Sequence, residues 1–239
     1  MGQVPHPLIV GNGKMATHFG HYLSLLGINY SQWSRRTHSD VSLRTLFDTS
    51  TLTILLLSDS AIESFVALHE FLKQKPLVHF SGALSIPNII GAHPLMAFSQ
   101  NLYGLDFYKQ IPFILETHQE NHLNFLPNDF FTIPSELKSY YHMLCVLSGN
   151  FTCILWQKFF DEFQTKFNLP KQAGELYLRQ ITQNIIRDHN TALTGPLVRN
   201  DSDTIRKHLD ALKADEFKDI YNAFVTLFEN RRNNTHEYS

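Results

Sequence analysis

The sequence has little cysteine, almost no net charge and no long uninterrupted apolar run, and each absence excludes a class of protein. Cys145 and Cys153 are the only cysteines among the 239 residues, and they lie eight positions apart on one predicted helix. A helix rises about 1.5 Å per residue, so the two thiols would lie roughly 12 Å apart, too far for a disulfide. We therefore expect a reduced protein without covalent cross-links.

The near balance of charge and the short apolar runs argue against nucleic-acid and membrane partners. Lys and Arg number 20 and Asp and Glu number 22, which gives a formal net charge of −2 without a basic run. Nucleic-acid binding normally needs a basic patch, and a membrane-spanning helix needs roughly 18 apolar residues in succession. The short polar stretch before Leu8 also lacks the pattern of a signal peptide. We expect a soluble, cytoplasmic protein with no nucleic-acid or membrane partner.

Two histidines, His118 and His122, are four residues apart, a spacing that also occurs in helical metal sites. Their segment is a poor helix former, and no carboxylate base accompanies them in the arrangement typical of zinc enzymes. We therefore expect no metal site.

The most informative stretch extends from Leu8 to Arg36. The apolar run Leu8–Val10 predicts a buried strand, and it leads directly into Gly11–Ala16, a loop with the pattern G-x-G-x-x-A. Apolar residues then recur at helical spacing until Gly27, and a second strand is expected over 28–33. A strand, a glycine-rich turn, a helix and a strand within about thirty residues are typical of a dinucleotide-binding unit.

The glycine-rich loop supplies the residues that we expect to bind a pyrophosphate. Gly11 permits the tight turn, and Gly13 lets a phosphate approach the backbone. The N-terminus of the following helix adds unpaired N–H groups and the positive end of its dipole. We assign to the cofactor site Gly11, Asn12, Gly13, Lys14 and Met15.

The end of the second strand indicates which dinucleotide would bind. An NAD site normally has an acidic residue about 20 positions after the glycines, where it binds the ribose 2′-hydroxyl. Here the sequence instead offers Ser34, Arg35 and Arg36. Guanidinium groups and a hydroxyl suit a 2′-phosphate, which an acid would repel. We expect NADP(H) as the cofactor; the alternative is a degenerate domain with an empty pocket and two solvated arginines.

Strands and helices continue to alternate after Arg36. Apolar, β-leaning segments lie at 52–57, 76–80, 89–92, 107–115 and 130–133. This alternation predicts an α/β fold with a doubly wound sheet, in which ligands bind at the carboxyl ends of the strands. The polar residues that follow two of these strands therefore join the predicted cofactor site: Ser58, Asp59, Ser81 and Gly82.

From Pro134 onward the apolar period changes to 3.6 residues and predicts an all-α C-terminal domain. We expect a Rossmann-like NADP-binding domain at 1–134 and a helical domain at 135–239. The predicted helices lie at 136–167, 170–193, 204–213 and 215–231. Their many aromatic side chains would mostly form a core, but they could also form the interface of a homodimer.

Four segments together resemble a known family. They are LVHFSGAL at 77–84, GAHPLMAF at 91–98, Tyr141-His142 with Ser148–Asn150, and ALTGPLVRND at 192–201 followed by His208-Leu209. Their order and spacing resemble Rossmann-like proteins whose helical C-terminal half is known as domain of unknown function 2520. Those proteins are similar in architecture to pyrroline-5-carboxylate reductases and to the 6-phosphogluconate and β-hydroxyacid dehydrogenases. The resemblance implies this fold, a nicotinamide cofactor and dimerisation through the helical domain.

The resemblance also suggests catalytic residues. β-Hydroxyacid dehydrogenases use a lysine on the first long helix after the sheet, and the comparable place here carries Asn150, which can hydrogen-bond a substrate but cannot act as an acid. A proton donor would then be His93, His142 or water, and we prefer His93 as the polar contact. The alternatives are that His93 only fixes a turn and that His142 is a core residue.

Arg199 is the third candidate catalytic residue. It follows the helix break at Thr194–Pro196, where a guanidinium group would suit a substrate carboxylate or a cofactor phosphate. The alternative is that Arg199 and Asp201 pair with each other and brace the loop.

These residues predict an NADP-dependent oxidoreductase that reduces a small carbonyl or imine substrate in the cleft between the two domains. The alternative is a non-catalytic NADP-binding sensor or scaffold protein, which the missing lysine would favour. A third possibility, an interaction partner with an empty cleft, would be excluded by dinucleotide binding.

Overall fold

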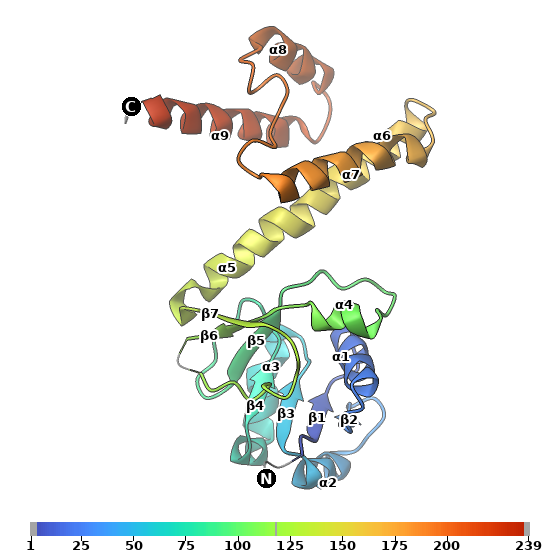
Figure 1. Cartoon of the computed structure of the whole chain (residues 1–239), viewed down its shortest axis with the longest axis vertical. Helices are drawn as coiled ribbons and strands as arrows, with labels where there is room; N and C mark the ends of the chain where they lie inside the picture. The colour runs from blue at the N-terminus through green and yellow to red at the C-terminus, as the bar shows by residue number, and fades with distance from the viewer. Residues whose placement is uncertain (1–3, 118, 237–239) are drawn as a thin grey trace. The chain divides into compact units, whose positions relative to one another are not determined.

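The computed structural model describes residues 4–117 and 119–236. These residues form two compact units, one that extends to Leu155 and one that begins at Trp156 (Figure 1). We call them the sheet unit and the helical unit and describe each by itself. The sequence places a boundary at residue 134, where the last strand ends. The sheet unit extends further because the next helix packs on the sheet, with Lys138 bonded to Glu116.

The sheet unit contains a seven-stranded sheet in the order β2-β1-β3-β4-β5-β6-β7. Neighbouring strands run parallel except for β5 and β6, which run antiparallel. The strands are β1 (Pro7–Val10), β2 (Ser31–Trp33), β3 (Leu52–Leu55), β4 (Leu77–His79), β5 (Ile90–Pro94), β6 (Phe113–Glu116) and β7 (Phe130–Ile133). The predicted α/β fold with a doubly wound sheet is confirmed.

Helices cover both faces of this sheet. They are α1 (Lys14–Leu25), α2 (Asp40–Thr49), α3 (Asp59–Leu68) and α4 (Leu105–Lys109), with the 3-10 turns η1 (Glu70–Gln74) and η2 (Ser135–Leu137). Ile9 of β1 packs with Phe19 of α1 on one face, whereas its neighbours Leu8 and Val10 pack with Phe47 of α2 on the other. Because side chains alternate across a strand, both faces of β1 are buried, which explains its uninterrupted apolar run.

One long helix leads out of the sheet unit. It consists of α5 (Lys138–Cys145), the π-helical turn η3 (Val146–Asn150) and α6 (Phe151–Thr165). The helix predicted over 136–167 is therefore present, and its irregular turn includes Ser148 and Gly149, where we expect a bend. A π-helical turn carries one extra residue and frequently marks a functional site.

The helical unit contains the rest of α6 together with α7 (Lys171–Arg187), α8 (Ser202–Ala211) and α9 (Lys218–His236). Gly174 lets α6 and α7 approach closely, because a Cβ at this position would lie 2.6 Å from the ring of Phe159. Asp201 begins α8 by accepting a hydrogen bond of 3.0 Å from the backbone N–H of Thr204. α7 ends six residues before the predicted position 193, and α9 continues beyond the predicted end at 231.

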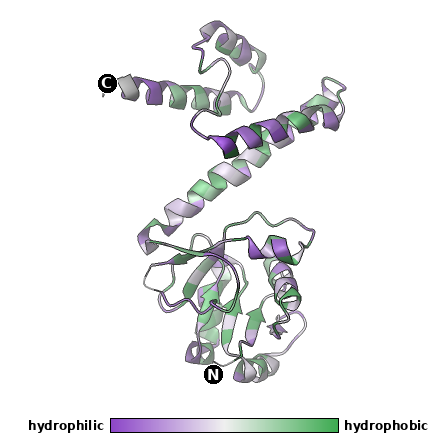
Figure 2. Ribbon diagram, viewed as in Figure 1, coloured by the Kyte–Doolittle hydropathy of each residue, from purple (hydrophilic) through white to green (hydrophobic). Residues whose placement is uncertain are grey.

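The segment Ser135–Thr165 is long and apolar enough to cross a membrane by length and composition alone. Its most apolar window has a mean hydropathy of 1.2, and none of that window is buried. Figure 2 shows the hydrophobic residues along α5 and α6. A single helix of this kind is weak evidence for a membrane span, so we assign no membrane role to this segment.

Candidate functional site at the carboxyl edge of the sheet

The glycine-rich loop is held tightly between β1 and its neighbours. Gly11 has a φ of 137°, and a Cβ on it would collide with the carbonyl oxygen of Leu56. Its N–H donates to the carbonyl of Trp33 at 2.8 Å, and its own carbonyl accepts from Gln32 Nε2 at 2.8 Å. Only glycine adopts this backbone conformation readily and also fits this space.

The first turn of α1 presents free backbone donors. Gly13 is the N-cap residue, and no side chain caps the helix there. Apart from its chain neighbours, no described residue has an atom within 4 Å of the position that a Cβ on Gly13 would occupy, so the space beside this residue is open. Uncapped N–H groups and the helix dipole together favour an anion at this position.

A cavity of about 420 Å³ extends from this loop to the end of β2. Among the described residues its lining contains no acidic side chain and consists of Gly11, Asn12, Gly13, Trp33, Ser34, Arg35, Arg36, Leu56, Leu57, Ser58, Ala61 and Phe65. Arg35 and Arg36 are exposed, and neither has an ion-pair partner within the described part of the chain. Ser34 is buried, and its hydroxyl shares a hydrogen bond of 2.9 Å with Thr37.

A second cavity of about 300 Å³ lies on the other side of the loop, along the ends of β3 and β4. Its lining includes Gly13, Lys14, Met15, Ser58, Asp59, Phe80 and Ser81. Ser81 Oγ donates to Asp59 Oδ2 at 2.8 Å, which ties the ends of the two strands together. The two cavities thus bring together the residues predicted to bind the cofactor, except Gly82.

Gly82 instead makes room for α5. A Cβ on Gly82 would collide with the imidazole ring of His142, so this glycine lets the helix pack against the turn after β4. Gly91 does the same for Lys138, whose ammonium group lies against its Cα. Both glycines belong to the sequence segments that resemble the known family, and both leave room for α5 to pack against the sheet.

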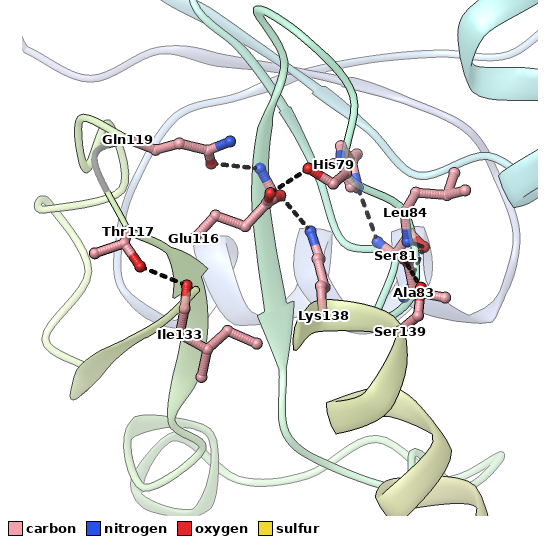
Figure 3. A network of polar contacts seen from close by, with 12 residues as sticks. His79, Ser81, Ala83, Leu84, Glu116, Thr117, Gln119, Ile133, Lys138 and Ser139 are labelled. Carbon is pink, nitrogen blue, oxygen red and sulfur yellow. Dashed lines mark hydrogen bonds and ion pairs between the residues drawn. The ribbon is translucent and has the colours of Figure 1, made fainter. Parts of the chain in front are cut away.

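A buried ion pair fixes the start of α5 (Figure 3). Lys138 Nζ donates to Glu116 Oε1 at 2.7 Å, and the two side chains are only 2% and 1% exposed. Ser85 donates a short hydrogen bond to the other carboxylate oxygen. Burial alone would raise the pKa of Glu116, but the hydrogen bonds and charge of its partners outweigh it and lower the pKa. Burial is also the largest cause of the lowered pKa of Lys138.

His79 lies at the end of β4, next to this ion pair. It is fully buried, its Nδ1 accepts from the backbone N–H of Ser81 at 3.2 Å, and its Nε2 has no partner within the described residues. Burial, followed by the charge of Lys138, lowers the pKa of His79 to about 4. The imidazole ring is therefore neutral at pH 7.

His93 lies at the corresponding end of β5 and contacts α5. Its Nδ1 is 2.8 Å from the hydroxyl of Tyr141, and its ring lies 5.9 Å from that of His142. Burial, then the neighbouring His142 and Lys138, lower the pKa of His93 to about 4. Burial raises the pKa of Tyr141, with a further contribution from Cys145. The pair therefore joins a neutral imidazole to a neutral phenol at pH 7.

The other candidate catalytic residues are placed differently. Asn150 is exposed at the end of the π-helical turn η3. Arg199 is exposed in the turn before α8 and belongs to the helical unit. Among the described residues Arg199 and Asp201 form no ion pair within 4 Å. Hydrogen bonds from Thr204 lower the pKa of Asp201 most, and the charge of Arg199 lowers it further. His118 lies outside the described residues, and His122 contacts Glu120 at 3.4 Å.

Sequence reasoning did not single out Lys138 and Glu116. Glu116 leaves a signal in the sequence, since it is a charged residue in an otherwise apolar strand, whereas Lys138 lies in a helix of mixed polarity and leaves none. Glu116 ends the run Phe-Ile-Leu-Glu of β6, and Lys138 begins α5. Pairing residues that lie 22 positions apart requires knowledge of how α5 meets the sheet.

The fold is thus a Rossmann-like sheet followed by helices, with two cavities on a glycine-rich loop and a polar cluster beside them. Residues 115–227 match a family described as a domain of unknown function, DUF2520, which confirms the predicted resemblance for this part. No curated protein matches the chain.

Solved structures share the fold over nearly the whole chain. A Thermotoga maritima protein, TM1727, is 24% identical, covers 94% of this chain and 97% of its own, and has a TM-score of 0.69. A Bacteroides fragilis protein provisionally named an NADP oxidoreductase is 24% identical, covers 98% of both chains and has a TM-score of 0.67. The pyrroline carboxylate reductase of Plasmodium falciparum, solved with NADP bound, is 13% identical, covers 95% of this chain and 97% of its own, and has a TM-score of 0.57.

Proposed function

We propose that the protein is an NADP-dependent oxidoreductase that reduces a small carbonyl or imine compound. The observation that carries this proposal is the acid-free cavity of about 420 Å³, which Ser34, Arg35 and Arg36 line beside the glycine-rich loop. Two guanidinium groups without an ion-pair partner in the described chain suit a ribose 2′-phosphate, and no lining carboxylate opposes it.

The residues present fit a dinucleotide. The open space at Gly13 and the uncapped N-terminus of α1 would receive the pyrophosphate. Ser58, Asp59 and Ser81 line the second cavity, where the nicotinamide end would bind. A bound reduced nicotinamide supplies hydride, and this chain must then hold the substrate and provide a proton.

The polar cluster and the similar structures support the proposed substrate class. His93 and Tyr141 are neutral hydrogen-bonding groups, which suit a carbonyl oxygen or an imine nitrogen. The pyrroline that names the Plasmodium enzyme is a cyclic imine. Asn150 would add a substrate hydrogen bond, and Arg199 would bind a substrate carboxylate.

Charge reversal at the arginine pair tests the cofactor assignment. In the variant Arg35→Glu/Arg36→Glu we expect the Kd for NADPH to rise on the order of 100-fold, because two charge-assisted contacts are lost. The Kd for NADH should change by less than about 3-fold. The control variant Arg44→Glu/Lys109→Glu makes the same charge change at exposed residues outside the cavity. Equal losses of NADPH and NADH affinity would remove the argument for 2′-phosphate recognition.

A second candidate function is an NADP-binding sensor or scaffold without turnover. It is favoured by Asn150, which is exposed and has no side-chain hydrogen bond within the described residues. This function predicts NADPH binding without NADPH oxidation across aldehydes, ketoacids and imines. One substrate with ordinary turnover would exclude it.

We also propose that the helical part of the chain forms a homodimer. Exposed apolar side chains follow one another along α5, η3 and α6: Met143, Leu144, Leu147, Phe151, Ile154 and Leu155. A second copy would cover this surface and its hydrophobic area would stabilise the pair. Light scattering should give twice the mass of one chain in detergent-free buffer, whereas a detergent requirement would favour a membrane instead.

A further inference from the structure

The contact between His93 and Tyr141 joins the sheet to α5 at the carboxyl edge. His93 belongs to β5 and Tyr141 to α5, 48 positions later in the chain, and their side chains meet at 2.8 Å. The two rings are nearly perpendicular, with centroids 5.7 Å apart. Both side chains are partly exposed.

The surrounding packing fixes where the Tyr141 hydroxyl lies. One turn earlier, Lys138 binds the buried carboxylate of Glu116, and the next residue, His142, packs against Gly82. These two contacts leave α5 little freedom to slide or rotate over the strand ends. A donor held in place by its neighbours avoids the cost of being positioned during the reaction.

Burial is the main reason that both partners stay neutral. Among the neighbouring groups, His142 and Lys138 lower the pKa of His93 further while Asp59 raises it, and Cys145 adds to the raised pKa of Tyr141. The lowered pKa of His93, about 4, prevents this residue from serving as a cationic acid at pH 7. A neutral imidazole carries one N–H, and with that proton on Nδ1 it donates to the oxygen of Tyr141. The proton of Tyr141 then points away from His93, either toward the side chain of Cys145, with which the hydroxyl also forms a hydrogen bond, or toward a bound substrate.

We propose that Tyr141 is the catalytic proton donor and that His93 is a positioning residue that orients its hydroxyl. This inference rests on the proposed oxidoreductase function and deepens it. The imine carbon receives the hydride that a reduced nicotinamide supplies, while the imine nitrogen takes the proton of Tyr141 Oη. The C=N double bond becomes a C–N single bond, and the phenolate regains a proton from water. The Nδ1–H group of His93 stabilises that phenolate meanwhile.

Adjacent tyrosines provide a matched pair for the first test. The variant Tyr141→Phe removes only the hydroxyl and should lower kcat for NADPH oxidation by the cyclic imine 2-methyl-1-pyrroline about 100-fold. The Kd for NADPH should change less than about 2-fold. Tyr140→Phe, at an exposed residue whose hydroxyl has no hydrogen-bond partner among the described residues, should retain kcat. Full activity of Tyr141→Phe in an active protein would overturn the donor role and leave the oxidoreductase function standing.

A second test needs no turnover. Residue 141 is replaced by 3,5-difluorotyrosine, whose phenol is more acidic than that of tyrosine, and its ionisation is followed by ¹⁹F NMR. The substitution His93→Phe should raise the pKa of this phenol by at least about 0.5 unit, because a donor to the phenolate is lost. A lowered pKa would show that His93 accepts the phenol proton, which would overturn the proposal.

The same label tests whether Tyr141 faces the cofactor. The pKa of the labelled phenol should be lower with NADP⁺ than with NADPH, because the oxidised ring carries a positive charge. The same label at position 140 should give equal pKa values with NADP⁺ and with NADPH. Equal values at position 141 would overturn the donor role, whereas failure to bind either nucleotide would overturn the proposed function itself.

Discussion

The two units of the chain bury their apolar side chains to different extents. In the sheet unit, two clusters of buried residues cover both faces of the strands, with Phe19 and Phe47 fully enclosed. In the described part of the helical unit, Val225 is the one large apolar side chain that is buried, whereas Ile186 is 80% exposed and Leu176 73%. The sheet unit therefore has its own core, whereas the helical unit, like the last helical segment of the sheet unit from Met143 to Leu155, retains apolar surface that another surface can cover.

The ion pairs differ in the same way. Lys138 and Glu116 are almost completely buried in the sheet unit. Lys158 of the helical unit binds Glu162 at 2.7 Å and Asp215 at 2.8 Å, but these side chains remain 18–28% exposed. A buried charge that loses its partner has no solvent to compensate it, whereas a partly exposed charge does. Equal substitutions in the two units should therefore have unequal effects.

The largest expected effect is the loss of the buried cation. Lys138→Met leaves Glu116 as an unpaired buried carboxylate and should lower the free energy of unfolding of the sheet unit by about 3–5 kcal/mol. Lys158→Met should lower the free energy of unfolding of the helical unit by less than about 1 kcal/mol.

Each unit contains one tryptophan, Trp33 and Trp156, so urea unfolding of Trp156→Phe and Trp33→Phe backgrounds reports on the units separately. Comparable losses in the two units would contradict the distinction between their ion pairs.

The second largest expected effect is a decrease in the stability of the sheet unit as the pH falls. The folded-state pKa values of His79 and His93, both about 4, lie below the ordinary value of about 6.5. Between these values the unfolded chain binds more protons, so stability is full above pH 6.5 and is lost as the pH falls toward 4. Fully buried His79 should contribute on the order of 3 kcal/mol to this loss.

Urea unfolding at pH 7, 6 and 5, followed through Trp33, measures this dependence. His79→Leu should make the curve flatter, since the unfolded chain then has one fewer histidine to protonate. The carboxylates of Glu162 and Asp215, whose pKa values are lowered by hydrogen bonds from Lys158, respond only below pH about 4.5. An unchanged slope in His79→Leu would refute the account of this histidine.

The smallest effect comes from adding one methyl group in each unit. In Gly91→Ala the new Cβ would collide with the buried ammonium group of Lys138, which should lower the free energy of unfolding by roughly 2 kcal/mol. Gly174→Ala would approach Phe159 and Phe160, whose rings are partly exposed and can move, and alanine favours the helix by about 1 kcal/mol. Its net effect should stay within about 1 kcal/mol. Equal unfolding midpoints for the two variants would contradict this difference in packing.

The sequence alone allowed much of the sheet to be predicted, because local chemistry determines it. The loop at Gly11 needs a residue without a Cβ, and the run at 52–57 needs cover on both faces. The strand predicted over 107–115 was wrong in its first half, where Leu105–Lys109 forms the short helix α4. Such short apolar, aromatic runs fit a strand or a helical turn equally well.

The polar cluster could be predicted only in part. His93 followed from its place after a strand, and its residue type suggested a proton donor. That suggestion changes once burial and the nearby His142 and Lys138 are known, because they keep His93 neutral at pH 7. We therefore propose Tyr141, whose hydroxyl contacts His93, as the donor instead. Both effects depend on how α5 packs on the sheet, which no local pattern encodes.

The central claim is that the cavity beside Arg35 and Arg36 binds a 2′-phosphorylated dinucleotide. Titration of the full chain with NADPH and with NADH, followed by nicotinamide fluorescence, tests it most directly. The account predicts that NADPH binds on the order of 100-fold more tightly than NADH. Equal affinity for both would contradict the role of the arginines, and binding of neither would contradict the proposed function.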